Sequence, residues 1–155
     1  MAAARVLLLS VFVLSLVAAV VGRWYYELQQ LLRCNEYPYA DATIALFEYD
    51  TFSPNDLCYV TNSSGHGTWH AKGYEVNDGG KPDNIQMHIR HRCGTNGKYV
   101  CYYRDLGRDM WTSNKADLRV WRLDTIDLAK EKSDDCYYRA KHAMAGGIWE
   151  SEWCA

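Results

Sequence analysis

The chain has 155 residues, with 17 Lys or Arg against 19 Asp or Glu, and its formal net charge is −2. This slightly acidic balance argues against nucleic acid as a partner. The charge is uneven, however, because residues 81–122 hold nine basic and four acidic side chains. The asymmetry suggests an anionic partner for the middle of the chain, although solvated sheet faces are the plainer explanation.

Residues 1–22 have the composition of a secretory signal peptide. Arg5 precedes an apolar run from Val6 to Val21, and small residues lead to Gly22. A membrane anchor is the alternative, but the run is shorter than the roughly 20 apolar residues of a spanning helix, and a polar domain follows it. We therefore expect a secreted, extracellular protein that is not integral to the membrane after cleavage. Removal would leave about 133 residues, enough for one domain with a modest core.

Short strand patterns separated by turns continue along the chain. Residues 23–34 fit a helix or a strand, and context favours the strand; 34–38 have turn chemistry; 43–50 predict a buried strand. Two further strands, 57–61 and 68–71, flank a Gly-rich turn, and 73–83 read as a polar loop.

Residues 84–101 predict a β-hairpin that organises the domain. Its first arm alternates between an apolar face and a basic face. The apolar face carries Ile85, Met87, Ile89, His91 and Cys93, and the basic face carries Gln86, His88, Arg90 and Arg92. The first face indicates core, and the second is the clearest candidate contact surface.

The last part of the domain is a polar segment, 104–117, followed by alternation over 118–128 that predicts one long strand or two with a bend. About seven short strands with turns between them indicate an all-β sandwich over residues 23–130. Residues 131–155 form a polar, irregular, Cys-containing tail.

Six cysteines, at positions 34, 58, 93, 101, 136 and 154, favour disulfides in an exported chain. Zinc is a weak alternative because no Cys-x-x-Cys pair occurs. Fifteen pairings are possible and the sequence fixes none, but the short connection from Cys93 to Cys101 can reach the roughly 5.5 Å Cα spacing of a disulfide. Asn62-Ser63-Ser64 is a sequon, which makes Asn62 a candidate glycan site.

The ordered motifs from Leu32 to Cys136 resemble the transthyretin-like family of secreted nematode proteins. They are Cys34-Asn35 with Pro38, Leu46-Phe47-Glu48-Tyr49-Asp50-Thr51 with Pro54, Gly67-x-Trp69 with Gly73, Ile89-Arg90-His91-Arg92-Cys93, Cys101, Trp121 to Leu128, and Cys136. The resemblance implies an extracellular, immunoglobulin-like Greek-key sandwich without a cofactor. It also offers a precedent for lipid recognition, because some members bridge phosphatidylserine on dying cells to a phagocyte receptor.

The chain departs from the family pattern at His66, near Gly107, and in having Cys58 and Cys154 beyond the usual four cysteines. The extra pair suggests a Cys58–Cys154 bridge that holds the tail. We also expect Cys34 to pair with Cys136.

No motif predicts catalysis or a metal site. His91 reads as a core histidine, and His66 with His70 would lack a third metal ligand. Ser63-Ser64-Gly65-His66 lacks the strand-to-helix elbow of a catalytic serine. Hydroxyisourate hydrolase, which shares the transthyretin fold, needs a terminal Tyr-Arg-Gly-Ser, whereas Tyr138-Arg139-Ala140 is internal here.

A non-enzymatic binding module therefore fits best. We expect it to recognise an extracellular or cell-surface partner, with an anionic lipid such as phosphatidylserine as one candidate. The candidate anion-binding residues are His88, Arg90, Arg92, Lys98, Arg104 and Arg119, with Tyr102 and Trp111 as a possible aromatic rim. An oligomeric carrier of small hydrophobic ligands, as in transthyretin, is the alternative.

Overall fold

The structure is a computed structural model that describes residues 22–48, 56–77, 81, 84–134 and 136. This part of the chain forms nine strands and two short 3-10 helices. They are β1 (Gly22–Cys34), β2 (Tyr37–Pro38), β3 (Thr43–Glu48), β4 (Asp56–Asn62), β5 (Thr68–Asn77), β6 (Ile85–His91), β7 (Val100–Gly107), η1 (Arg108–Met110), η2 (Lys115–Asp117), β8 (Trp121–Arg122) and β9 (Ile126–Asp127). No helix among the described residues has the length and apolar character needed to cross a bilayer.

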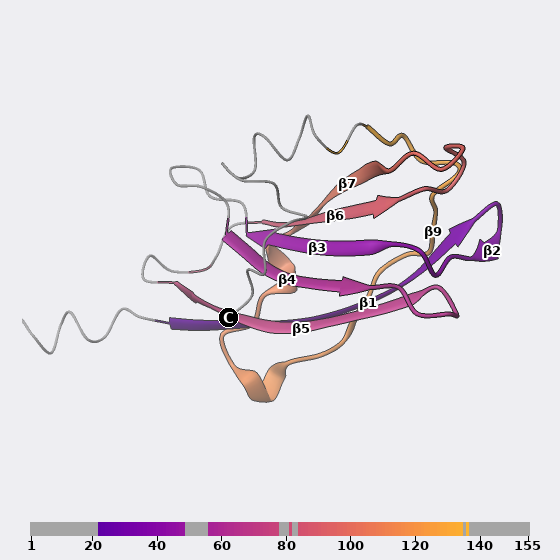
Figure 1. The fold of residues 1–155 in the computed structure, drawn as a ribbon. Coiled ribbons are helices and arrows are strands. Elements are labelled where there is room, and N and C mark those ends of the chain that lie inside the picture. The colour runs from indigo at the N-terminus through magenta and orange to yellow at the C-terminus, as the bar shows by residue number, and fades with distance from the viewer. Residues whose placement is uncertain (1–21, 49–55, 78–80, 82–83, 135, 137–155) are drawn as a thin grey trace, which may run out of the picture.

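The strands form two sheets that stack as two layers (Figure 1). In the first sheet β1 is central, with β5 antiparallel to it, β2 joined through a hairpin, and β8 and β9 parallel to it. The second sheet has the antiparallel order β4-β3-β6-β7. The predicted all-β sandwich is confirmed. The structure has nine strands where about seven were expected, and three of the nine, β2, β8 and β9, have only two residues each.

The core lies between the layers, and period-two alternation explains which residues enter it. The even-numbered residues of β1 in the first sheet face the core. From the second sheet, the odd-numbered residues of β6 and the even-numbered residues of β3 pack against them. The buried set includes Tyr26, Leu28, Leu32, Ile44, Leu46, Trp69, Ile85, Met87 and Ile89. Burial of each large apolar side chain contributes roughly 1.5–3 kcal/mol. The prediction that residues 85–93 turn one face toward the core is confirmed.

Tyr26 shows how closely the first sheet is packed. Its ring is fully buried and meets Trp111 edge to face, with ring centroids 5.2 Å apart. A Cβ atom added at Gly73, directly opposite Tyr26 on β5, would lie 2.5 Å from the tyrosine hydroxyl oxygen. Trp111 is only 4% exposed, so its expected place on an exposed aromatic rim is wrong.

Several predicted element boundaries differ from the structure, and two of them have a clear physical reason. The strand expected at 68–71 extends to Asn77, because the 13-residue β1 offers pairing partners along its length from Gly22 to Leu31. Of the two alternatives expected over 118–128, one long strand or two with a bend, the structure has two strands, β8 and β9, each only two residues long. Between them the carbonyl of Asp124 accepts a hydrogen bond from the side chain of Gln30 instead of a strand partner.

Candidate functional site

The connection between β6 and β7 is a tight loop at one end of the second sheet. Gly94, Asn96 and Gly97 have positive φ angles, which glycine and asparagine tolerate best. The Thr95 hydroxyl lies within hydrogen-bonding distance of the carbonyl oxygens of Arg92 and Lys98, and so ties the two ends of the loop together. The loop therefore places Lys98 and Tyr99 beside the last residues of β6.

Two guanidinium groups meet at the ring of Tyr99. The Cζ atom of Arg90 lies 3.8 Å from the ring centroid, and that of Arg92 lies 5.0 Å from it. Both distances fall within the range of cation–π attraction. Tyr99 is 39% exposed, so this Arg90–Tyr99–Arg92 cluster lies at the surface.

Asp41 holds Arg92 in place from the neighbouring connection between β2 and β3. The Nε atom of Arg92 donates to the Asp41 carboxylate at 2.8 Å, and Nη2 contacts the same oxygen. This hydrogen bond raises the pKa of Arg92. The backbone N–H of Arg92 also donates to the Tyr39 hydroxyl at 3.0 Å, while burial raises the pKa of Tyr39.

The other predicted anion-binding residues do not join this cluster. His88 is 4% exposed and packs between the rings of Phe47 and Tyr103, each 4.6 Å away between centroids, so its expected exposure is wrong. Arg104 lies opposite Met87, a core residue, and therefore emerges on the other face of the sheet from Arg90.

Arg119 belongs to the first sheet's side of the molecule, where its guanidinium stacks 4.1 Å from the ring of Trp121, next to β1. The predicted six-residue set is thus divided, and Arg90, Arg92 and Lys98 remain together. Tyr102, the other expected rim residue, is only partly buried.

His91 is a buried histidine that connects β6 to the segment after β9. It is 1% exposed, its Nε2 atom lies 3.0 Å from the Ser133 hydroxyl, and its Nδ1 atom has no hydrogen-bond partner among the described residues. Burial lowers its pKa to about 4. A serine beside a histidine resembles a nucleophile with its base, but no carboxylate of the described residues hydrogen-bonds Nδ1, and so low a pKa makes a weak base at neutral pH.

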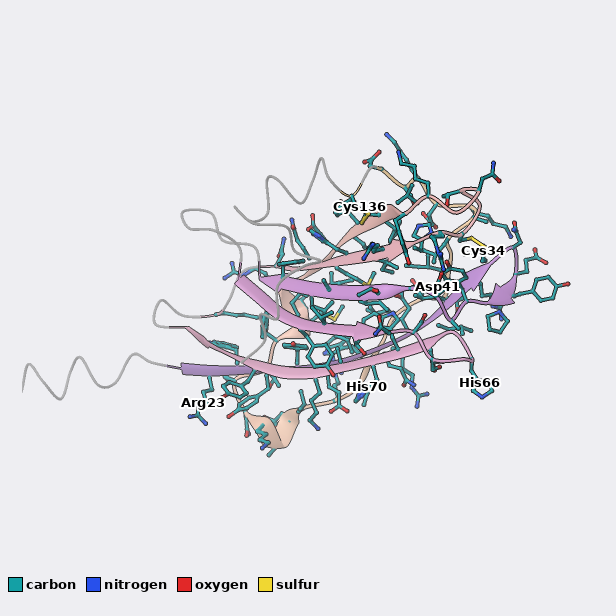
Figure 2. The ribbon with its side chains drawn as sticks, in the orientation of Figure 1. Arg23, Cys34, Asp41, His66, His70 and Cys136 are labelled. Atoms are coloured by element: carbon teal, nitrogen blue, oxygen red, sulfur yellow. A yellow bond between two sulfur atoms is a disulfide. The ribbon has the colours of Figure 1, made fainter. Side chains whose placement is uncertain are left out.

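The expected metal-binding possibilities gain no support from the described side chains, which contain no group of three His, Cys, Asp or Glu residues able to hold an ion. His66 and His70 are both exposed, and Figure 2 places them apart, His66 at a turn and His70 on β5. His70 instead contacts Glu27 through Nε2 at 2.9 Å.

Two disulfides are formed among the described cysteines, and both differ from the predicted pairs. Cys34 bonds to Cys93 and Cys101 bonds to Cys136, with Cα separations of 5.7 and 4.9 Å. The predicted Cys93–Cys101 and Cys34–Cys136 pairs are wrong for a geometric reason. Cys101 lies opposite Arg90 and projects to the outer face, whereas Cys93 follows His91 into the core.

The remaining predictions stay untested. The Cys58–Cys154 bridge and the signal peptide over residues 1–22 lie outside the described side chains, as does the tail beyond Cys136. Asn62 is exposed at the end of β4, and its glycosylation stays a prediction.

Sequence reasoning missed three residues that shape the cluster, namely Tyr39, Asp41 and Tyr99. Tyr99 could have been found, because it follows the loop glycine and precedes β7 in the same hairpin as Arg90. Asp41 could not, because it lies 51 residues from Arg92 along the chain.

Comparisons with known proteins show what the chain is similar to. A comparison with curated proteins found no match. Among solved structures, a 9R-lipoxygenase from Cyanothece PCC8801 is similar to this chain at 9% identity and a TM-score of 0.42, covering 68% of this chain and 16% of that one. A family model described as Transthyretin-like family, TTR-52, matches residues 31–106. Those residues run from β1 into β7 and include both arginines of the cluster, and the match supports a transthyretin-like family assignment.

Proposed function

We propose that this protein is a secreted, non-enzymatic binding module that uses the Arg90–Tyr99–Arg92 cluster, with Lys98, to bind an anionic group on an extracellular or cell-surface partner. The observation that carries the proposal is the convergence of two guanidinium groups on one exposed tyrosine ring. Cations that are already held in position lose less side-chain entropy when a ligand arrives.

The chemistry of the cluster suits a phosphate or a carboxylate. Guanidinium groups present planar pairs of N–H donors that match both anions. Asp41 occupies donors of Arg92, so we treat Arg92 as a positioning residue, and we assign the ligand contacts to Arg90 and Lys98 of the same hairpin.

Phosphatidylserine is the first ligand to test, because its headgroup carries both a phosphate and a carboxylate. The family assignment supports this choice. The extracellular location is supported by two disulfides, which persist in oxidising compartments and are rare in the cytosol.

Liposome flotation at 150 mM NaCl, the roughly physiological ionic strength, tests the proposal. We expect the purified protein to float with vesicles that contain phosphatidylserine and not with phosphatidylcholine vesicles. The R90Q/K98Q variant should lose flotation. The charge-matched R104Q/K132Q variant should retain it, because Arg104 emerges on the other face of the sheet.

Equal flotation with both vesicle types, or equal loss in both variants, would refute the lipid assignment. Binding of free phosphoserine without flotation would assign the same cluster to a soluble phosphorylated ligand instead.

Two alternatives from the sequence stay predictions. A carrier of small hydrophobic ligands would need an oligomer, and sedimentation of the purified chain tests it. Hydroxyisourate hydrolase activity can be checked by a single turnover assay.

A further inference from the structure

The first sheet has an outer face, turned away from the second sheet, that the proposed function does not use. Odd-numbered residues of β1 project to this face, together with their ladder partners on β5 and β8. Exposed basic side chains occur along its whole length, and Figure 2 shows two of them, Arg23 and His70, on this side. We call this the cationic face, after its four lysine and arginine residues: Arg23, Arg33, Lys72 and Arg122.

The carboxylates of this face are withdrawn behind their cationic partners. The side chain of Glu27 is only 15% exposed. Its carboxylate oxygens lie 2.9 Å from His70 Nε2 and 3.0 Å from Lys72 Nζ. The side chains of His70 and Lys72 are 52% and 53% exposed. Hydrogen bonds from Lys72 and then from His70 lower the pKa of Glu27, which keeps it ionised and paired.

Asp127 on β9 repeats this arrangement next to Arg33. Its side chain is 12% exposed beside Lys130, whose side chain is 64% exposed. Arg33 and Arg122 themselves have no ion-pair partner within the described part of the chain. Glu27 and Asp127 are therefore less exposed than the cations beside them, whereas Glu36, which also pairs with Lys130, has a side chain that is 77% exposed.

The cations are spread out along the sheet instead of converging on one point. Arg23 and Arg33 are ten residues apart on one strand, which corresponds to about 33 Å. A single phosphate or headgroup can contact only a small part of such a surface, whereas an extended polyanion can follow it.

Tyr25 and Tyr74 add a second recognition element on the same face. Their ring centroids are 6.2 Å apart, Tyr74 is 57% exposed, and Arg23 lies 5.4 Å from the Tyr74 ring centroid. Aromatic side chains combine an apolar ring with a polar tip, so they can pack on the C–H surface of a sugar ring while the hydroxyl hydrogen-bonds.

We propose that the cationic face binds a linear anionic polysaccharide that carries sulfate or carboxylate groups. Polysaccharide is favoured over nucleic acid because the two disulfides indicate an oxidising, extracellular setting. It is favoured over a membrane surface because the face presents mainly hydrogen-bonding groups such as Gln29 and Thr68, with Tyr74 as its largely exposed aromatic ring.

Binding to heparin, used as the probe, tests the proposal with the full mature chain. We expect retention on a heparin column at 150 mM NaCl, elution at higher salt, and no retention on uncharged dextran. The R33Q/R122Q variant should bind heparin roughly three- to thirtyfold more weakly, the effect of losing two exposed ion contacts. The R104Q/K132Q variant removes the same charge from elsewhere and should bind as the native chain does.

Equal weakening in the two variants, no retention at 150 mM NaCl, or single-stranded DNA displacing heparin at equal charge concentration would overturn the proposal. So would a loss of anionic-vesicle flotation in R33Q/R122Q equal to its loss of heparin binding, since the face would then be a membrane surface. R90Q/K98Q should keep heparin binding, so this inference and the proposed function can fail separately.

Discussion

The carboxylate of Asp127 accepts a hydrogen bond from the backbone N–H of Glu36, at 2.9 Å, across 91 positions of sequence. Its other oxygen accepts from the backbone N–H of Asn35 at 3.0 Å. Asn35 and Glu36 have φ angles of 51° and 72° and form the two-residue turn between β1 and β2, so both N–H groups of this turn bond to one carboxylate. An aspartate from β9 thereby fixes the β1–β2 hairpin, next to the Cys34–Cys93 disulfide.

Replacement of Asp127 by Asn should destabilise the fold, because an amide cannot accept both backbone hydrogen bonds as well as a carboxylate does. Burial raises the pKa of Asp127, but the backbone hydrogen bonds from Glu36, Ala129 and Asn35 and the contact with Lys130 outweigh it, and the net pKa falls below the ordinary 3.8. A depressed pKa adds stability that is complete above the ordinary value and is lost as pH falls through the folded-state value.

Urea unfolding of D127N and the native chain at several pH values measures this effect. The native chain should be more stable from pH 7 down to about 4, and the two should converge below that. D124N, which removes an exposed carboxylate, is the control and should leave stability unchanged. If D127N were less stable than the native chain by the same free energy of unfolding at pH 2 as at pH 7, the role assigned to the ionised carboxylate would be contradicted.

Gly67 should tolerate no side chain. Its φ angle is 74°, and an added Cβ atom would collide with the backbone oxygen of Leu32 and lie 2.8 Å from the backbone nitrogen of Tyr39. Backbone atoms of a sheet cannot move away cheaply, so we expect G67A to lose at least about 1–3 kcal/mol of unfolding free energy. G65A, in the same turn, meets nothing within 4 Å and is the matched control. Similar urea midpoints for the two variants would contradict this account.

Much of the architecture was predictable because alternation reports which residues share a face of a strand. The period-two pattern of residues 85–93 was enough to place Ile85, Met87 and Ile89 in the core. The same pattern could not show that His88 is buried too. Its burial depends on Phe47 and Tyr103, which come from neighbouring strands.

The candidate site was predictable only where it is local in sequence. Arg90, Arg92 and Lys98 belong to one hairpin and remain together, whereas Arg104 was separated from them by the register of β6 and β7. Cysteine pairing failed for the same reason. Loop length limits which cysteines can meet, but the face from which each side chain emerges decides which do.

Gln30 is a second polar residue whose role depends on distant partners. It is 2% exposed; its Nε2 donates to the Asp124 carbonyl at 2.8 Å, and its Oε1 accepts from the Trp69 indole N–H at 3.2 Å. Q30M has a similar volume but leaves the buried indole N–H of Trp69 without its acceptor, while the carbonyl of the exposed Asp124 loses only a part-buried hydrogen bond. We expect a loss of about 1–3 kcal/mol, the cost of one buried polar group left unpaired.

Chemical denaturation of Q30M beside Q29M tests this interpretation. Gln29 precedes Gln30 on β1 but projects to the outer face, so Q29M should unfold within about 0.5 kcal/mol of the native chain. Q29M should also leave the fluorescence of Trp69 unchanged, because the Trp69 indole N–H bonds to Gln30 and not to Gln29. Equal stability of the two variants would show that the buried amide contributes nothing beyond its packing.

His91 should make the fold sensitive to mild acid. Burial lowers its pKa from 6.5 to about 4, so the unfolded chain takes up a proton before the folded chain does. Its contribution to stability is therefore complete above about pH 6.5 and is lost as pH falls toward 4. Between pH 7 and pH 5 the native chain should lose about 2 kcal/mol through this residue.

The H91Q variant separates the proton from the hydrogen bond. A glutamine amide can still reach the Ser133 hydroxyl but cannot take up a proton, so the loss between pH 7 and pH 5 should shrink by about 2 kcal/mol whatever the variant's stability at pH 7. H66Q, at an exposed turn, should keep the native pH dependence. Because the tested quantity is a slope, a uniform loss of stability in H91Q leaves the prediction intact. An unchanged slope would instead assign the acid sensitivity to other groups.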